Sequence, residues 1–316
     1  MQSARANVGS VVAERSKPGG GRGLSAVLDH EEALGYLLVA PVVLILLGLV
    51  AYPFLYALQL SLTDRTIGNP GNFVGLDNVV NLWQNGIYRQ TVRNTVVFSI
   101  SSVILKLFLG FGVALLINEQ FRFRKLVRSA ILLPWIVPTV LSGMAWLWLF
   151  TPNFSVLNWI IVQLGWSQRG VPWLTDPAMA MVSVIIVNTW RGLPFFAITL
   201  LAGLQTIPQE LYEASAIDGA GRWGRFRHVT LPLMKPILMV TLVLSIIWTF
   251  SDFQVVYALT QGGPRNSTHV LATLSYQVGV TSGRLGEGVA ISLTMLPLLL
   301  LLVVVQLRNL RGSGTA

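Results

Sequence analysis

The chain has 316 residues, of which 53% are hydrophobic and only 11% are charged, with a mean hydropathy of +0.65. Because a soluble domain carries about 25% charged residues, this composition excludes a chain of soluble domains, and it is too apolar for a disordered chain. The 22 Lys and Arg residues outnumber the 13 Asp and Glu residues and give a net charge of +9, which in a membrane protein indicates basic cytoplasmic loops rather than nucleic-acid binding.

The first 30 residues form a basic stretch rich in Gly and Ser, which we predict to be a disordered cytoplasmic tail. Contact with anionic lipid is one interpretation of this tail, and a solvated tail that only helps to set topology is the one we favour. Beyond it, six segments have the roughly 20 mainly apolar residues that a membrane-spanning helix needs. They are residues 37–60, 94–117, 129–150, 178–204, 236–260 and 289–307. We expect the third of them to be broken by Pro134 and Pro138, which a membrane helix tolerates where neighbouring groups satisfy the freed backbone. We therefore predict an all-α integral membrane domain of six transmembrane helices over residues 31–312, with a C-terminal tail at 313–316.

The basic residues between the spans predict the orientation. The side that holds both termini, the second–third connection and the fourth–fifth connection carries 14 Lys and Arg residues, whereas the other side carries 6. The positive-inside rule places the first side in the cytoplasm. An even number of spans is consistent with two cytoplasmic termini.

The sequence lacks the patterns expected of a catalytic or ATP-binding chain. It has no G-x-x-x-x-G-K-[ST] loop for ATP. It has no cysteine, which excludes disulfides and Cys-based metal sites, and its three histidines lack the spacing of metal ligands. We predict no enzyme activity and no cofactor or metal in this chain.

Three predicted spans each carry one charged residue, namely Lys106, Arg191 and Asp252. A charge in hydrocarbon is costly unless it faces protein or water, so each of them requires an explanation. Arg191 and Asp252 fall near the middle of the fourth and fifth spans. There they form either a structural ion pair or gate hinge, which we favour, or a contact with a polar ligand. Lys106 is a candidate for pairing with another subunit.

The fourth span contains Trp190-Arg191-Gly192-Leu193-Pro194, which we expect to break the helix and to act as a hinge. A site for a polar ligand such as a sugar needs aromatic faces and amide or carboxylate groups. The candidates for such a substrate pathway are Asn188, Arg191, Trp248, Asp252, Phe253 and Tyr257. On one continuous fifth helix, the last four would share part of one face at best.

The connection between the fourth and fifth spans predicts two short helices. Thr206 is placed to cap the first one, with Pro208 in its first turn and Gln209 as its capping-box partner. Asp218-Gly219 is a turn signal that ends this helix, and residues 223–229 form a second amphipathic stretch. We expect a helix–turn–helix at the cytoplasmic surface to which another protein can bind.

This connection, residues 205–232, also resembles a known motif. Glu213-Ala214-Ser215, a Gly four residues later at Gly219, and Val229-Thr230-Leu231-Pro232 are similar to the EAA loop of ABC importer permeases. That signature has Glu-Ala-Ala, the same Gly, and Ile-x-Leu-Pro, so Ser215 and Val229 are mild departures. Further motifs resemble the maltose-type sugar permeases, and they lie at residues 93–95, 132–135, 201–205, 207–208, 216–220 and 259–264. The resemblance covers about residues 34–308.

The resemblance implies a type I ABC importer permease fold with a cytoplasmic coupling helix that docks in a groove on a separate ATPase. Glu213 would pair with a basic group of the ATPase, Gly219 would permit the turn, and Leu211, Tyr212 and Ala214 would fill the groove. The candidate coupling residues are Glu210, Leu211, Tyr212, Glu213, Ala214, Ser215, Asp218, Gly219 and Ala220. The alternative is an ordinary amphipathic loop at the lipid headgroups.

The resemblance further implies the permease subunit of an importer that moves a carbohydrate across a bacterial-type inner membrane. Its expected partners are a second permease subunit of different sequence, two ATPase subunits that bind ATP and Mg²⁺, an extracytoplasmic solute-binding protein and membrane lipid. An importer for glycerol phosphate or another polyol-like solute shares the same motifs and stays open. A stand-alone secondary carrier or channel would not need an EAA-like loop, and a membrane enzyme lacks a catalytic constellation.

Overall fold

The computed structural model describes residues 31–152 and 155–313. The predicted tail at residues 1–30 and the last three residues lie outside this range. The chain divides into two units, residues 1–56 and residues 57–316. The described part of the first unit is helical throughout, with α2 (Glu31–Leu46), the π-helical turn η1 (Leu47–Ala51) and the beginning of α3 (Tyr52–Ser61).

The second unit is also helical, and the only β-structure among its described residues is two isolated bridges in the loop after α3. Its elements are α4 (Asp77–Gln84), α5 (Gly86–Asn118), α6 (Arg124–Ile136), α7 (Thr139–Phe150), α8 (Val156–Gln163), α9 (Pro177–Gln205), α10 (Gln209–Ile217), α11 (Arg222–Arg225), η2 (Phe226–Thr230), α12 (Leu231–Phe250), α13 (Gln254–Leu259), α14 (Leu271–Tyr276), η3 (Gln277–Thr281), α15 (Leu285–Leu293) and α16 (Leu296–Ser313).

Five helices of the described chain are long and apolar enough to cross a membrane, and the bent pair α6–α7 makes six if it counts as one span. The predicted all-α membrane fold is thus confirmed. The fourth span agrees almost to the residue, because Asp176 caps α9 by accepting from the backbone N–H groups of Ala178 and Met179. The second span is longer than predicted and begins at Gly86.

The predicted break of the third span is confirmed at one of its two prolines. Helices α6 and α7 meet at an angle of 95° on either side of Val137-Pro138, whereas Pro134 lies inside α6. Pro138 lacks the N–H that a continuous helix would need, and proline disfavours helical backbone at the residue before it. The fifth predicted span does not run helically to residue 260, because α12 ends at Phe250 and the chain passes through Ser251–Phe253 before α13 begins.

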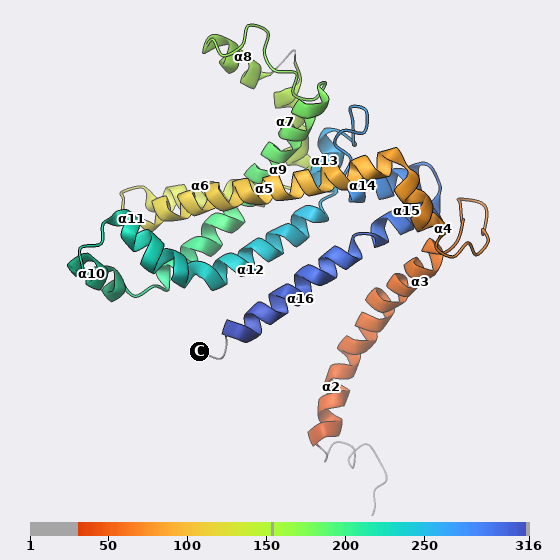
Figure 1. Ribbon diagram of the computed structural model, residues 1–316, viewed down its shortest axis with the longest axis horizontal. Coiled ribbons are helices and arrows are strands. Elements are labelled where there is room, and N and C mark those ends of the chain that lie inside the picture. Colours follow the sequence, from red (N-terminus) through yellow and green to blue (C-terminus); the bar gives the residue numbers. More distant parts are fainter. Residues whose placement is uncertain (1–30, 153–154, 314–316) are drawn as a thin grey trace, which may run out of the picture. The chain divides into compact units, whose positions relative to one another are not determined.

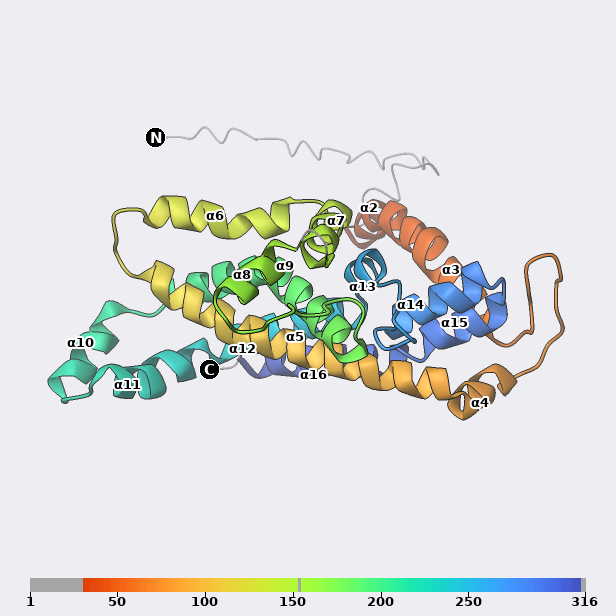
Figure 2. The same cartoon turned by 90° about the horizontal axis from the view of Figure 1, so that it is seen from above.

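The core of the second unit forms where α5 and α9 pack side by side (Figures 1 and 2). Gly110 of α5 allows this approach, because a Cβ there would collide with Phe196 of α9. Around this contact, α12 adds Met234 to a buried apolar cluster that includes Phe196 and Leu200. In both views α10 and α11 lie at one end of these helices, and α13, α14 and α15 lie at the other.

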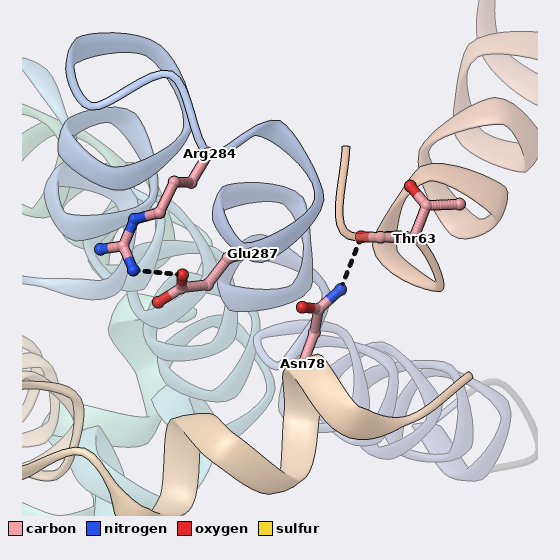
Figure 3. Close-up of polar contacts among 4 residues, drawn as sticks. All are labelled: Thr63, Asn78, Arg284 and Glu287. Carbon is pink, nitrogen blue, oxygen red and sulfur yellow. Dashed lines mark hydrogen bonds and ion pairs between the residues drawn. The ribbon is translucent and has the colours of Figure 1, made fainter. Parts of the chain in front are cut away.

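Polar contacts hold the end of α3 and the loop after it to α4 and α15. Figure 3 shows one of them, between Asn78 and Thr63, and the separate pair Arg284–Glu287 at the start of α15. Asn78 donates from Nδ2 to the carbonyl oxygens of Ser61 and Thr63, at 2.7 and 2.8 Å. The N–H of Gly286 in α15 donates to the carbonyl of Arg65, and a Cβ at Gly286 would collide with the Thr63 carbonyl. Arg284 and Glu287 form an ion pair of 2.6 Å at the start of α15.

The loop between α13 and α14 packs on one buried histidine. His269 is 2% exposed, and its Nδ1 lies 3.1 Å from the hydroxyl of Thr273. Gly262, at φ +92°, lies against the imidazole ring so closely that a Cβ would collide with it. Burial lowers the pKa of His269 below its usual 6.5, although a hydrogen bond with the Gln277 side chain raises it in part.

We expect this histidine to make the protein less stable in acid. A lowered pKa means that the unfolded chain binds the proton more readily, so stability is full above about pH 6.5 and falls as the pH drops below that value. The thermal unfolding midpoint of the purified protein, measured between pH 7.5 and about pH 5, should decrease. In His269→Gln the decrease should be smaller, whereas the same change at the exposed His228 should leave it as in the wild type. Equal pH dependence in all three proteins would contradict the prediction.

Candidate functional site

The three isolated charged residues of the predicted spans meet at one open cavity of about 590 Å³ in the second unit. Such a volume lies in the range of small-molecule sites, which is about 300–1,000 Å³. The cavity is walled by α5, α6, α9, α12 and the segment after α12. Its lining residues are Lys106, Trp135, Asn188, Arg191, Gly192, Phe195, Ser245, Trp248, Thr249, Ser251, Asp252, Phe253 and Gln254.

Lys106 connects three helices at this cavity. It extends from α5 across Gly192 of α9, where a Cβ would lie 2.8 Å from Cδ and Cε of the lysine. Its Nζ then donates to Oγ1 of Thr249 in α12, at 2.8 Å. Lys106 is 4% exposed, and the hydrogen-bond partner that the structure gives it lies within its own chain.

Asp252 lies in the break after α12, not in the middle of a spanning helix as predicted. Its Oδ2 accepts from Nδ2 of Asn188 in α9 at 2.7 Å, and its Oδ1 accepts from the N–H of Val255 at 3.1 Å. The helix break therefore leaves a carboxylate facing the cavity. The amide oxygen of Asn188, Oδ1, is buried and has no hydrogen-bond partner among the described residues.

Arg191 lines the same cavity but does not form the predicted ion pair with Asp252. The one ion pair within 4 Å among the described side chains is Arg284–Glu287. The predicted break at Arg191 is also wrong, because α9 continues through Pro194 to Gln205. The guanidinium thus lies at the cavity wall with donors that no described residue engages through a hydrogen bond or ion pair.

Aromatic side chains form the apolar part of the cavity wall. Phe195 lies edge-on to Trp248 at 4.9 Å between ring centroids and to Trp135 at 6.2 Å. Phe253 lines the cavity, whereas Tyr257 does not and instead stacks on Phe253 at 4.8 Å. Tyr276 completes this second aromatic group, 5.2 Å from Phe253.

Sequence reasoning missed several lining residues, and one of them could have been found. Phe195 lies seven residues after Asn188, with Arg191 and Gly192 between them, so all four share one face of a helix. Trp135 and Thr249 carry no comparable signal, because each lies on another helix and its approach depends on tertiary packing.

The fourth–fifth connection forms α10, a turn, and a helix that runs without interruption from Arg222 to Phe250. The predicted cap at Thr206 is wrong. Its hydroxyl donates to the carbonyl of Gly203 at 2.8 Å and so closes the end of α9, while α10 begins after Pro208 without a side-chain cap. The predicted stop is confirmed, because α10 ends at Ile217 and Gly219 follows at φ +81°.

The exposed surface of α10 differs in part from the predicted coupling surface. Glu210, Glu213 and Ala214 are exposed, and so is Ile217, at 87%, which the prediction did not include. These residues lie three, four and seven positions apart, so they share one face of the helix. Tyr212 turns inward instead, with its hydroxyl 3.1 Å from that of Thr230 in η2.

The remaining candidates are Leu211 near the beginning of α10, Ser215 in its last turn, and three residues of the turn after it. Leu211, Asp218 and Gly219 are exposed, while Ser215 and Ala220 are half-buried. The N–H of Ala220 donates to the carbonyl of Ser215 at 2.9 Å, which closes the turn. Among the residues that the structure describes, no group of His, Asp and Glu is arranged to hold a metal ion.

Comparison with known proteins identifies the family. Residues 106–310 match the model of the binding-protein-dependent transport system inner membrane component. The trehalose/maltose transport system permease of Thermococcus litoralis is 37% identical, over 90% of this chain and 96% of the relative. The sulfoquinovosyl glycerol transport system permease of Agrobacterium fabrum is 35% identical, over 89% and 91%. The diacetylchitobiose uptake system permease of Streptomyces coelicolor is 34% identical, over 93% and 92%.

The fold matches as well. A chain in the crystal structure of a bacterial ABC transporter that imports the acidic polysaccharide alginate superposes with a TM-score of 0.74 at 24% identity, over 89% of this chain and 95% of that one. The family that the sequence resembles is confirmed by the family model and the relatives, and the structural match confirms its fold. The chain belongs to the family of binding-protein-dependent transport system inner membrane components, the membrane-spanning permease subunits of ABC importers.

Proposed function

We propose that this permease moves a carbohydrate into the cytoplasm, and that the cavity between α5, α9 and α12 is its part of the substrate pathway. The observation that carries the proposal is the convergence of Lys106, Arg191, Asn188 and Asp252 beside the faces of Phe195 and Trp248. A sugar presents hydroxyl groups that both donate and accept hydrogen bonds, together with apolar ring faces. A cavity with donors, a carboxylate acceptor and aromatic walls suits that chemistry.

Relatives support the carbohydrate class. The permeases named for trehalose/maltose and for diacetylchitobiose each match about nine-tenths of this chain. A solute with a glycerol part is the second candidate, because the relative from Agrobacterium fabrum is named for sulfoquinovosyl glycerol. This candidate includes the glycerol phosphate and polyol-like solutes that the sequence motifs leave open.

We further propose that α10 is the contact with a separate ATPase, which binds ATP and Mg²⁺. Its exposed face carries two carboxylates and two apolar side chains in one row, and the sequence there resembles the EAA loop. The complete importer would contain a second permease of different sequence, two ATPase copies and an extracytoplasmic solute-binding protein. The charge distribution supports cytoplasmic termini, with α10 on the same side.

Reconstitution tests the proposal. This chain, tagged and produced together with the genes that adjoin its own, should purify with an ATPase and a second permease. In lipid nanodiscs, ATP hydrolysis should rise when the solute-binding protein is loaded with the correct solute among maltose, trehalose, diacetylchitobiose and sulfoquinovosyl glycerol. Purification without an ATPase would overturn the importer assignment. Stimulation by none of the three sugars, with stimulation by the glycerol-containing solute, would favour the second candidate.

A further inference from the structure

The basic residues near the α10 end of the bundle fall into two groups with different contacts. Arg124 and Arg128 of α6 donate to the carbonyl of Ile117 at the end of α5, at 2.8 and 3.5 Å. They serve as a cap for that helix, as cations at a helix C-terminus do. A second group begins the long helix Arg222–Phe250, and it has no such role.

The second group consists of Arg222, Arg225, Arg227 and Lys235, and none of their side chains makes a hydrogen bond or ion pair with another described residue. No Asp or Glu occurs anywhere in residues 219–251. The buried Nε of Arg225 also has no partner within the described chain. Their charge therefore has no counterpart within this part of the chain and is available to an external anion.

The exposed side of this helix alternates aromatic, basic and apolar side chains at intervals of four residues. Trp223 is 72% exposed, Leu231 is 42% exposed, and Arg227 and Lys235 are exposed as well. We call these four residues the basic stripe. An interval of four residues keeps side chains on neighbouring positions of one helix face.

The tryptophan of the basic stripe is held firmly in place. Its indole stacks on Phe226 at 5.4 Å and 22°, and Phe226 packs edge-on against Phe111 of α5 at 5.6 Å. Tryptophan is enriched where a helix passes through the headgroup layer of a membrane, because its ring is largely apolar and its N–H is polar. An exposed tryptophan at position 223 therefore suits a place in the headgroup layer.

We propose that the basic stripe binds the phosphate groups of anionic phospholipids in the membrane leaflet that this helix enters. Eight residues separate Arg227 from Lys235, which is about 12 Å along the axis, whereas one headgroup layer is only about 6 Å thick. Lys235 nevertheless reaches that layer, because side chains on a helix tilt toward its N-terminus and a lysine extends its ammonium group to the interface. Leu231, between the two cations, meets the acyl chains.

This geometry favours lipid over an acidic surface of the ATPase. A water-soluble subunit can follow the helix as far as the headgroups but not into the hydrocarbon, where Leu231 and the stem of Lys235 lie. The acidic and apolar face of α10 offers a separate contact for such a subunit. The inference does not depend on which solute the importer carries.

Bromine-labelled lipids test the proposal in the complete importer complex, reconstituted in phosphatidylcholine nanodiscs that contain a minority of phosphatidylglycerol. Bromine on the acyl chain quenches a nearby tryptophan, and the signal of Trp223 is the difference between wild type and Trp223→Phe. We expect brominated phosphatidylglycerol to quench this signal at least about twofold more than the same amount of brominated phosphatidylcholine. In the double variant Arg227→Gln/Lys235→Gln, both lipids should quench the Trp223 signal equally. The control Arg169→Gln, in an exposed loop between α8 and α9, should behave as the wild type.

Two results would overturn the proposal. Equal quenching by the two lipids in the wild type would mean that the basic stripe does not select anionic headgroups. Absence of quenching by either lipid would mean that a protein subunit covers Trp223. Retained phosphatidylglycerol, counted by native mass spectrometry, provides a second readout and should decrease in the double variant without loss of any subunit.

Discussion

Glu213→Lys is expected to abolish stimulation of ATP hydrolysis by the loaded solute-binding protein, together with solute uptake. Glu213 is exposed on the same face of α10 as Glu210, Ala214 and Ile217, and we propose that this face docks on the ATPase. Loss of one partner from a buried charge pair costs about 2–5 kcal/mol, which is about 30-fold or more in affinity. Reversal of the charge adds repulsion to that loss.

Two further variants test the shape and the apolar part of the same contact. Gly219→Pro should act like Glu213→Lys, because φ +81° is inaccessible to proline and the N–H that Gly219 donates to Ala216 is lost. Ile217→Asp should weaken the contact, because it places a charge at the most exposed apolar residue of α10. Glu119→Lys, an exposed charge reversal just after α5, is the matched control and should leave activity unchanged. Wild-type uptake and stimulated hydrolysis in both Glu213→Lys and Gly219→Pro would refute the docking role.

The sequence predicts the existence of the membrane helices better than their shape. Hydropathy locates α9 almost to the residue, because a long apolar run and a capping Asp176 act at the same place. The positions of bends are predicted less well, because a proline in the sequence does not by itself determine whether the helix breaks there. Pro134 and Pro194 lie inside continuous helices, whereas Pro138 follows a break of 95°. Whether a neighbouring helix accommodates a proline depends on packing that composition does not record.

For the candidate site, the sequence likewise identifies residues but not their contacts. The rarity of charge in the spans is enough to single out Lys106, Arg191 and Asp252. It does not predict their partners, because these lie 143 residues away for Lys106 and 64 residues away for Asp252. The Arg191–Asp252 ion pair, one form of the structural or gating role that the sequence favoured, is not present among the described side chains. The carboxylate instead accepts from Asn188, one turn before Arg191. Only the face shared by Asn188, Arg191 and Phe195 follows from helical spacing.

The second large effect is expected from the carboxylate of the cavity. Asp252→Asn preserves the size of the side chain but removes its charge, and the new amide presents its NH2 group to one of the two donors, Asn188 or Val255, that the carboxylate now accepts from. Hydrogen bonds to charged groups contribute about 1.5–3 kcal/mol each. We therefore expect uptake to fall about tenfold or more, with the same direction for Arg191→Gln, whose guanidinium faces the cavity.

A matched control separates the cavity from the rest of the membrane core. Thr241→Val removes a hydroxyl that is fully buried in α12 but does not line the cavity, where it bonds only to the carbonyl of Ile237. It changes neither side-chain size nor charge appreciably, so uptake should stay close to that of the wild type. A decrease as large as that of Asp252→Asn would mean that α12 tolerates no polar change, and that the cavity has no special part.

Assembly of the complex decides between two roles for Asp252, which are contact with the solute and a structural contact that holds α9 against the end of α12. If the carboxylate contacts the solute, Asp252→Asn should purify with its partner permease and ATPase in wild-type proportions, while uptake falls. Lys106→Met should then also assemble, because methionine fills the path across Gly192 without a charge. If Asp252→Asn instead fails to assemble, the Asn188–Asp252 contact serves to hold α9 against the end of α12. The cavity would then owe its polar groups to the packing of its helices, and the proposed substrate pathway would have to be abandoned.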